Sequence, residues 1–575
     1  MDGKTNHIIS AAIDFGTTFS GYAYSTRGDF RQSPDKVSCP VWNTRSGYLQ
    51  SLTTSTCVLF NPDNTFSEFG FQAEDKYFDL AEEENEKEWY FLRRFKMELY
   101  KTKAPEDIEL KSFGGKTLPA MYVFSAAIEY LKNQLLETCG NHGFDLRPHD
   151  IQWVLTVPAI WDDSAKLFMR KAAVKAGILS ETLLLVLEPE AAAVYCKSIL
   201  ATEHGSSMDN TILGNFKPGT KNMVVDAGGG TVDITVHQVQ DGGTLREVCA
   251  AGGGDWGGTM VDKDFVSLLR KIFGHDIFDT FQREHIDDSL DILRDLEQKK
   301  RTVFDKPDGS ISILVPGSLL ETRQGFKSPT AVEYDENIVF KRNKLLISSK
   351  CARSLFESSI EGIVNQLKKM MDDPRVADIS SIIMVGGYSE CSFLQERVIK
   401  EFPTTRVIVP PEGALAVLKG AVITGHTPSA ITHRVCRYTY GIGLNSLFRK
   451  GVHDEKRKYV DARGKVRCSG TFEKQVTIGD VIKVGHKGER LVFQVKNETS
   501  TKIIIQIYVS LQPNPAYVNH DGCKKLGLLV VDMPDTTKGL NRGVSSQMVF
   551  GGSEINVEAS DIDTGQRFSV NFDFL

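Results

Sequence analysis

The sequence predicts a two-lobed α/β domain followed by a smaller all-β domain, and three observations point to this architecture. The chain has 575 residues, which is too long for a single hydrophobic core. A pattern of strand, glycine turn and strand occurs twice, at 11–24 and at 224–236. Helical spacing of apolar residues almost disappears after residue 426, where short alternating runs indicate strands. We therefore expect an α/β domain over 8–428 and a β-rich domain over 430–575.

Composition and charge exclude several classes of protein. Hydrophobic residues make up 41% of the chain and charged residues 25%, which are ordinary values for a globular protein. The formal net charge of −6 argues against a nucleic-acid binder, which usually carries a basic face. Ten cysteines without C-x-x-C pairs indicate reduced thiols. The polar N-terminus and the lack of a long apolar run predict a cytoplasmic protein with no membrane span.

The second glycine turn, in VVDAGGGTVDITV, has the residues that a bound phosphate requires. Glycine inside a strand costs backbone entropy, so three in a row need a reason. Because Gly228, Gly229 and Gly230 lack a Cβ, they can aim backbone N–H groups at an anion. Asp226 and Asp233 have the wrong charge for phosphate, but they suit a hydrated magnesium ion that phosphate shares. A bulged structural hairpin is the alternative.

The first glycine turn, in AAIDFGTTFSGYAY, repeats this design. Asp14 and Gly16 have the same spacing as the aspartate and the first glycine of the second turn, and Thr17 has its counterpart in Thr231. Two such turns in one chain predict two similar half-domains that face each other across a nucleotide. We place these lobes at about 8–205 and 215–428, joined by a Gly/Ser/Asn/Pro-rich linker within 201–220.

The other elements follow from hydrophobic spacing. The acidic run at 81–88 is interpreted as a solvated helix face. Helical spacing predicts helices at 121–139, 164–178, 259–305, 352–371, 391–401 and 412–425, with a strand running into a helix over 183–199. Strand patterns occur at 8–24, 152–158, 222–238, 310–347, 381–387 and 406–410. Beyond residue 430, strand patterns occur at 475–485, 490–497, 502–510, 527–533, 555–561 and 567–575.

Two common nucleotide-binding motifs are disfavoured. The run GGGDWGG at 252–258 contains G-x-G-x-x-G, but it lacks the strand, helix and downstream acidic residue of a dinucleotide-binding unit. The tripeptide GKT at 115–117 lacks the glycine five positions before Gly115 that a P-loop requires. Neither NAD binding nor a P-loop fold is expected.

Taken together, the motifs resemble those of the 70-kDa heat-shock proteins, which belong to the actin-like ATPase superfamily with its α/β ribonuclease H-like fold. The resemblance covers about residues 8–426, and the aromatic-rich first turn looks most like the divergent heat shock 70 kDa protein 12 subfamily. The motifs are IDFGTTFSG at 13–21, VLTVPAIWDDSAK at 154–166, LEPEAAAVY at 187–195, VVDAGGGTVDITV at 224–236, GGGDWGGTMVDKDF at 252–265, LEQKKRTVF at 296–304 and IIMVGGYSECSFLQ at 382–395.

The resemblance implies that ATP or ADP binds together with Mg²⁺. It implies nucleotide contacts at Gly16, Thr17, Thr18, Phe19, Gly228, Gly229, Gly230, Thr231, Gly254, Glu297, Lys300, Arg301, Gly386, Gly387 and Tyr388. It implies that magnesium is held, mostly through water, by Asp14, Glu188, Asp226 and Asp233. It implies that Lys96 orients the attacking water together with Glu188, Asp233 and Asp226. Glu297, Lys300 and Arg301 also fit one helical face by their spacing.

The chain departs from the family pattern at several places. Tyr388-Ser389-Glu390 stands where the family has an arginine that stacks on adenine, so Tyr388 either stacks instead or is a surface tyrosine. Leu187 precedes Glu188 where the family has asparagine. ITHRVCRYTYGIG at 431–443 replaces the acidic-leucine linker between the domains, and no helical lid or acidic tail follows the last predicted strand.

These features leave three functions open. The first is an ATP-binding, chaperone-like protein with slow magnesium-dependent hydrolysis, whose β domain binds a protein client or partner and whose ATPase domain accepts co-chaperones. The second is a nucleotide-regulated adaptor that binds ATP or ADP and hydrolyses little. The third is a small-molecule kinase of the same superfamily, which the complete order of chaperone-type motifs disfavours.

Overall fold

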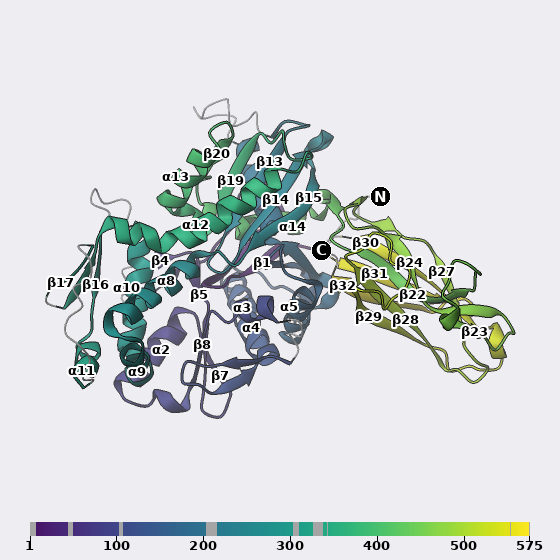
Figure 1. Ribbon diagram of the computed structural model, residues 1–575, viewed down its shortest axis with the longest axis horizontal. Coiled ribbons are helices and arrows are strands. Elements are labelled where there is room, and N and C mark those ends of the chain that lie inside the picture. Colours follow the sequence, from purple (N-terminus) through teal and green to yellow (C-terminus); the bar gives the residue numbers. More distant parts are fainter. Residues whose placement is uncertain are drawn as a thin grey trace. The chain divides into compact units, whose positions relative to one another are not determined.

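The computed structural model describes residues 7–43, 50–102, 107–202, 216–302, 310–325, 337–341, 343–551 and 554–573. The chain forms two compact units, which Figure 1 shows in sequence colours. The first unit comprises Met1–Ile160, Phe168–Val236 and Ala251–Thr427, and the second comprises Trp161–Leu167, His237–Ala250 and Pro428–Leu575.

A five-stranded sheet forms the centre of the N-terminal half of the first unit. Its order is β12-β11-β1-β2-β5, with β1 and β2 antiparallel and β1, β11 and β12 parallel. The strands are β1 (Ile9–Phe15), β2 (Phe19–Thr26), β5 (Thr54–Ser55), β11 (Ile151–Val157) and β12 (Leu183–Leu187). Ile13 pairs with Leu155, and Val157 pairs with Leu187. This register places Asp14, Thr156 and Glu188 at the same edge of the sheet.

A second sheet forms the centre of the C-terminal half of the first unit. Its strands are β13 (Lys221–Ala227), β14 (Val232–Val239), β15 (Leu245–Gly254), β19 (Ser381–Val385) and β20 (Arg406–Ile408), in the order β20-β19-β13-β14-β15. The strands β13 and β19 are parallel, and Asp226 pairs with Val385. The second glycine turn therefore lies beside the loop that begins at Gly386.

Helices and smaller sheets surround these two sheets. In the N-terminal half they are α1 (Arg27–Gln32), β3 (Trp42–Asn43), β4 (Gln50–Ser51), β6 (Cys57–Phe60), β7 (Phe66–Phe69), α2 (Phe71–Glu82), β8 (Tyr90–Arg93), α3 (Met97–Lys101), β9 (Glu109–Lys111), β10 (Thr117–Pro119), α4 (Ala120–Asn141), α5 (Asp163–Lys175) and α6 (Glu188–Thr202). In the C-terminal half they are α8 (Gly258–Phe273), α9 (His275–Glu284), α10 (Ile286–Thr302), β16 (Ile311–Leu314), α11 (Gly317–Gly325), β17 (Ile338–Lys341), β18 (Lys344–Ile347), α12 (Ser349–Met371) and α13 (Ser392–Glu401). The helix α14 (Ala416–His426) follows these elements in the sequence but packs on the sheet of the N-terminal half.

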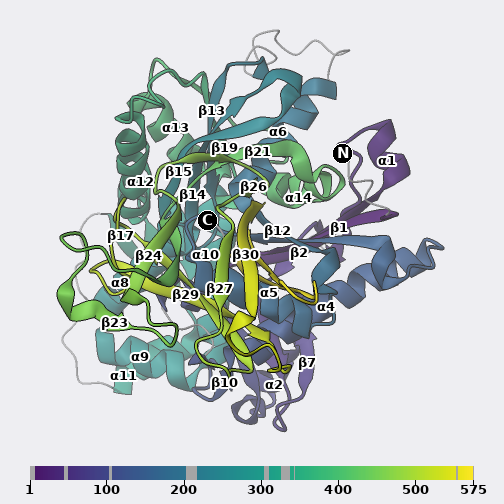
Figure 2. The same cartoon turned by 90° about the vertical axis from the view of Figure 1, so that its right-hand side faces the viewer.

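The core of the N-terminal half depends on a close approach of two helices. The helix α14 packs on α6 and on β1, and Figure 2 shows the two helices side by side. A Cβ on Gly420 would overlap the backbone carbonyl of Ala191, so the two helices touch through a glycine. Ala12, Val154, Ala191, Leu418 and Ala421 belong to the apolar cluster at this contact, and none is more than 1% exposed. This packing fixes β1, and with it the first glycine turn.

Most predicted helices are confirmed, but two segments differ from expectation. The acidic run at 81–88 is mostly exposed as predicted, yet it is not a helix face, because α2 ends at Glu82 and a short 3₁₀ turn follows with Glu86 buried. The strand-rich stretch 310–347 also contains the helix α11. Most of the predicted linker lies outside the described residues, which stop at 202 and resume at 216.

The second unit is rich in strands. Its strands β21 (Ile431–Val435) and β25 (Val481–Lys483) continue from the part of β15 that belongs to this unit. One further sheet has the order β23-β24-β22-β28-β29, with β22 (Thr439–Leu447), β23 (Lys458–Val460), β24 (Val466–Val476), β28 (Lys502–Ser510) and β29 (Cys523–Asp532). The other contains β26 (His486–Lys487), β27 (Leu491–Gln494), β30 (Gly543–Gly551), β31 (Glu554–Asp561) and β32 (Arg567–Asp573).

In the part of the chain that the structure describes, no helix combines the length and apolarity needed to cross a membrane.

Candidate functional site

The two glycine turns enclose a cavity of about 230 Å³ in the first unit. Both turns follow the carboxyl ends of central strands, β1 in one half and β13 in the other. Ligand sites in α/β proteins characteristically lie at this edge of a sheet. The predicted residues that line the cavity are Asp14, Gly16, Thr17, Thr18, Phe19, Lys96, Glu188, Asp226, Gly228, Gly229, Gly230, Thr231, Glu297, Lys300, Gly386, Gly387 and Tyr388.

The turns are packed against each other, with threonine side chains on one side and glycines on the other. A Cβ on Gly229 would overlap the side chain of Thr18. A Cβ on Gly230 would overlap Thr17 Oγ1 and Met97 Sδ. Gly229 and Gly230 are thus required by the residues they face, in addition to any ligand.

The peptide groups of the second turn have a fixed direction. The carbonyl oxygens of Gly228, Gly229 and Gly230 accept hydrogen bonds from the backbone N–H groups of Gly258, Thr259 and Gly257, at 3.1, 2.8 and 3.2 Å. In a planar trans peptide, the N–H points opposite to the C=O. The N–H groups of residues 229–231 therefore point away from the start of α8. Three N–H groups on one side of a turn form an anion-binding arrangement.

One lysine and four carboxylates gather beside the turns. Lys96 Nζ donates to Glu188 Oε1 at 2.7 Å, and both side chains are buried. Thr156 Oγ1 donates to Asp14 Oδ1 at 2.7 Å, and the backbone N–H of Ile160 donates to Asp233 Oδ1 at 2.8 Å. These bonds hold the carboxylates of three separate elements at one location.

Burial and mutual repulsion oppose ionisation of these carboxylates. Burial raises the pKa of Asp14, against the attraction of Lys96 and the hydrogen bond from Thr156. Burial, with Asp14 and Asp233 nearby, raises the pKa of Glu188 to about 7, although Lys96 opposes the shift. Burial and then the charge of Glu188 hold the pKa of Asp226 well above its usual range. The site has more negative charge than Lys96 balances, so it favours an added cation.

The carboxylates suit a hard cation, but through water. Oxygen donors are the ligands that magnesium prefers, and magnesium usually keeps several of its waters. Among the described residues, no three acidic, histidine or cysteine side chains converge closely enough to hold a metal ion directly. A hydrated ion held at a distance is the form of magnesium binding that this arrangement fits.

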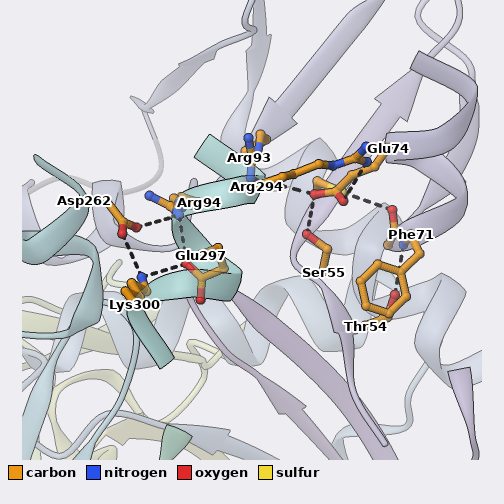
Figure 3. Close-up of polar contacts among 12 residues, drawn as sticks. Thr54, Ser55, Phe71, Glu74, Arg93, Arg94, Asp262, Arg294, Glu297 and Lys300 are labelled. Atoms are coloured by element: carbon orange, nitrogen blue, oxygen red, sulfur yellow. Dashed lines mark hydrogen bonds and ion pairs between the residues drawn. The ribbon is translucent and has the colours of Figure 1, made fainter. Parts of the chain in front are cut away.

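Four charged side chains form a network at the other end of the cavity, which Figure 3 shows. Lys300 Nζ lies 2.7 Å from Asp262 Oδ1 and 2.6 Å from Glu297 Oε2. Arg94 Nη2 lies 2.7 Å from Asp262 Oδ2 and 3.6 Å from Glu297 Oε2. Arg94 follows β8 in the N-terminal half, whereas the other three residues belong to α8 and α10. Glu297 and Lys300 line the cavity, so this network joins the two halves at the cavity wall.

A second polar cluster joins the halves beside the first. Glu74 of α2 accepts a hydrogen bond from Ser55 Oγ at 2.7 Å and one from Arg294 Nη2 of α10 at 3.1 Å. Arg93 Nη2 lies 3.8 Å from the same carboxylate. Arg93 and Arg94 are neighbours in the chain, and Lys96 follows two residues later. The segment 93–96 is therefore anchored to both halves.

The loop after β19 contacts the second turn through a glycine. Gly386 has φ +86°, and a Cβ there would come within 2.5 Å of Asp226 Oδ1 and of the Ala227 carbonyl oxygen. Tyr388 lines the cavity but is only 8% exposed, and its hydroxyl lies 3.0 Å from Ser359 Oγ. Tyr388 is therefore not a surface tyrosine, and its hydroxyl ties the ring to α12.

Two predicted residues do not line the cavity, and a third lies outside the described side chains. Asp233 is buried outside the cavity lining, and its Oδ1 accepts a hydrogen bond from the backbone N–H of Ile160. Gly254 makes room for the Trp256 ring, which a Cβ would approach to 2.7 Å. The side chain of Arg301 lies outside the described part of the structure.

Sequence reasoning missed several residues at the site. Thr156 could have been found, because it lies near the end of a buried strand, two residues before Pro158. Arg94 and Asp262 could not have been found from the sequence, because they lie 168 positions apart and no sequence pattern pairs them. The cavity is also lined by Ser51, Thr53, Gly258, Phe356, Glu390, Cys391, Ala414 and Val417.

Comparisons with known proteins show extensive sequence similarity to one family. The sequence profile of a family described as "Hsp70 protein" matches residues 59–442. Heat shock 70 kDa protein 12A of Mus musculus is 32% identical, with 99% of this chain and 92% of the relative covered. Heat shock 70 kDa protein 12B of Homo sapiens is 30% identical, with 99% and 91% covered. Chaperone protein DnaK of Thermotoga neapolitana is 25% identical, with 47% and 41% covered.

Proposed function

Since this chain belongs to the Hsp70 protein family, we propose that it binds ATP and ADP in the cavity between the two glycine turns. We further propose that it acts as a chaperone-like protein with slow, magnesium-dependent hydrolysis. Membership of this family implies the two-lobed actin-like ATPase fold that the motifs predict. Three relatives are named heat shock proteins or a chaperone, which supports the chaperone-like part of the proposal.

The observation that carries the proposal is the direction of the N–H groups in the second turn. Backbone N–H groups of residues 229–231 point away from α8, while Thr17 and Thr18 present hydroxyls from the opposite turn. Phosphate oxygens accept hydrogen bonds from both kinds of donor. The β- and γ-phosphates would lie between the turns, where charge on the γ-oxygens is stabilised without movement of the protein.

The carboxylates and Lys96 would prepare the reaction with water. Bound magnesium neutralises charge on the phosphates and so lowers the barrier to attack. Asp14, Glu188, Asp226 and Asp233 would hold it through its waters. Lys96 lies 2.7 Å from Glu188, and this pair would orient the attacking water. Slow hydrolysis is expected because a carboxylate bonded to lysine is a weak base.

Glu297 and Lys300 would bind the nucleoside end. Both line the cavity, and both already bond to Arg94 or Asp262. The loop 386–388 would approach the nucleotide through Gly386 and Gly387. The buried position of Tyr388 supports a role as part of the pocket wall, in place of the stacking arginine.

The strand-rich second unit would bind the protein client or partner. Its sheet β23-β24-β22-β28-β29 has β23 and β29 as outer strands in the pairing order, and an outer strand can pair with an extended peptide. The proposal includes the β domain predicted over 430–575 as this binding part. Co-chaperone binding and the cytoplasmic location stay predictions.

Single-turnover hydrolysis tests the proposal. Wild type, Asp226→Asn and the exposed control Asp276→Asn would be mixed with ATP and magnesium, and inorganic phosphate and nucleotide affinity would be measured. We expect slow phosphate release in wild type and control, and none in Asp226→Asn. Tight binding without phosphate release would favour the adaptor. Absence of adenine-nucleotide binding in wild type would refute the assignment of the cavity.

A further inference from the structure

One part of the second unit exposes several apolar side chains within twenty residues. Leu447, Val452, Tyr459, Val460 and Val466 are 56%, 69%, 37%, 65% and 40% exposed. We call this group the 447–466 tip. Single exposed apolar residues are common on proteins, but a cluster marks an interaction site. Figure 1 shows β23, which contributes two of these residues, at one end of the strands of the second unit.

The strand register places the apolar side chains on both faces of the sheet. Leu447 and Tyr459 both pair with Arg467, so they share one face. Val460 pairs with Val466, and successive residues of a strand point to opposite faces. The second pair therefore lies on the other face. A ligand for this tip must contact both faces of one thin edge.

The same segment is strongly basic. Residues 445–467 contain eight lysines and arginines but three aspartates and glutamates, in a chain whose net charge is −6. Lys458 pairs with Glu455 at 3.4 Å, and Arg467 pairs with Asp461. The remaining basic residues include four exposed ones, Arg449, Lys450, Lys456 and Lys465. The apolar tip is thus surrounded by exposed positive charge.

We propose that the 447–466 tip binds the surface of an anionic lipid membrane. Lipid acyl chains and headgroups can surround a protruding edge on both faces, whereas a folded protein would need a matching cleft. Apolar side chains that enter the headgroup layer, together with basic residues near anionic lipids, produce peripheral binding that depends on lipid charge. Charge complementarity and the two-sided apolar edge favour this partner over an acidic protein.

Vesicle sedimentation with the full chain tests the proposal. The vesicles would contain phosphatidylcholine alone or with added phosphatidylserine. We expect binding only with phosphatidylserine, and weaker binding at high salt because salt screens exposed charges. Val452→Asp and the double variant Lys450→Glu/Lys456→Glu should each bind about tenfold more weakly.

Matched controls lie at the opposite end of the same sheet. Thr439, at the start of β22, pairs with Ser510, and Leu447 is at the other end of β22. Leu511 is 62% exposed, and Lys524 and Lys525 are exposed beside the same end. The variants Leu511→Asp and Lys524→Glu/Lys525→Glu should bind like wild type. Circular dichroism would confirm that every variant is folded.

Four results would overturn the proposal. The first is no binding to phosphatidylserine vesicles. The second is equal binding by tip and control variants, and the third is equal binding to vesicles with and without phosphatidylserine. The fourth is binding of polyglutamate to the tip without vesicle binding, which would assign the surface to an acidic protein segment.

Discussion

The two glycine turns share the Asp-x-Gly pattern, yet they face the cavity with different groups. The first turn presents the side chains of Thr17 and Thr18, whereas the second presents backbone through three consecutive glycines. Gly229 and Gly230 lie where the threonine side chains of the other turn already fill the space that a Cβ would need. The comparison teaches that a repeated motif need not keep the same residues, because each copy must fit the other.

Gly229→Ala breaks this fit and should have the largest effect. Its Cβ would overlap the side chain of Thr18, so we expect the free energy of unfolding to fall by about 3 kcal/mol. Adding Thr18→Ala should recover part of the loss, because it removes the overlapping atoms. Urea unfolding of the two single variants and of the double variant gives the interaction energy between positions 18 and 229. A double variant no more stable than Gly229→Ala would contradict the packing argument.

Gly386→Ala tests whether the second turn depends on the loop behind it. Gly386 has φ +86° and ψ 158°, a conformation that is nearly restricted to glycine, and a Cβ would press on Asp226. We expect a loss of about 2 kcal/mol in unfolding free energy. Gly387→Ala is the matched control, because no atom lies within 4 Å of its added Cβ. Equal losses of unfolding free energy in Gly386→Ala and Gly387→Ala would show that the close approach of Gly386 to Asp226 does not affect stability.

The aspartates of the two turns should respond differently to loss of charge. Asp226 is buried among other carboxylates, whereas Asp14 has a hydrogen bond from Thr156 and the attraction of Lys96. Without magnesium and nucleotide, Asp226→Asn should therefore stabilise the fold by about 1 kcal/mol, and Asp14→Asn by less. Thermal unfolding of metal-free protein measures this. A larger gain in stability from Asp14→Asn than from Asp226→Asn would contradict this expectation.

The smallest effect concerns a histidine on the second strand of the second hairpin. Burial lowers the pKa of His237 from 6.5 to about 4. The unfolded chain then binds more protons between these values, so stability falls as the pH drops through this window. At pH 6 the loss is about 0.8 kcal/mol relative to pH 8.

The variant His237→Leu should remove this part of the pH dependence. Urea midpoints at pH 8 and pH 6 would be compared with those of wild type. The control is His275→Leu, at an exposed position on α9. Its urea midpoint should change with pH as that of wild type does. If the urea midpoint of His237→Leu changes between pH 8 and pH 6 as much as that of wild type, His237 is not the source of this pH dependence.

Sequence patterns predicted the elements that carry the site better than the contacts between them. Apolar spacing identified α4 and α12, and the repeated Asp-x-Gly identified both turns, because these signals are local. The Arg94–Asp262 pair and the burial of Tyr388 depend on residues brought together by folding. No local pattern shows that Tyr388 would bond to Ser359, 29 positions away. The 447–466 tip likewise could not be predicted, because it is defined by side-chain exposure and strand register, which the sequence does not show.

The hydrogen bonds between the second turn and α8 have a consequence for amide exchange. The first N–H groups of a helix have no acceptor within the helix and ordinarily exchange quickly with solvent. In this chain, those of Gly257, Gly258 and Thr259 are bonded to the carbonyl groups of the turn. Their exchange with deuterium therefore requires the turn to separate from the helix. The rates at these three amides report how often the turn opens.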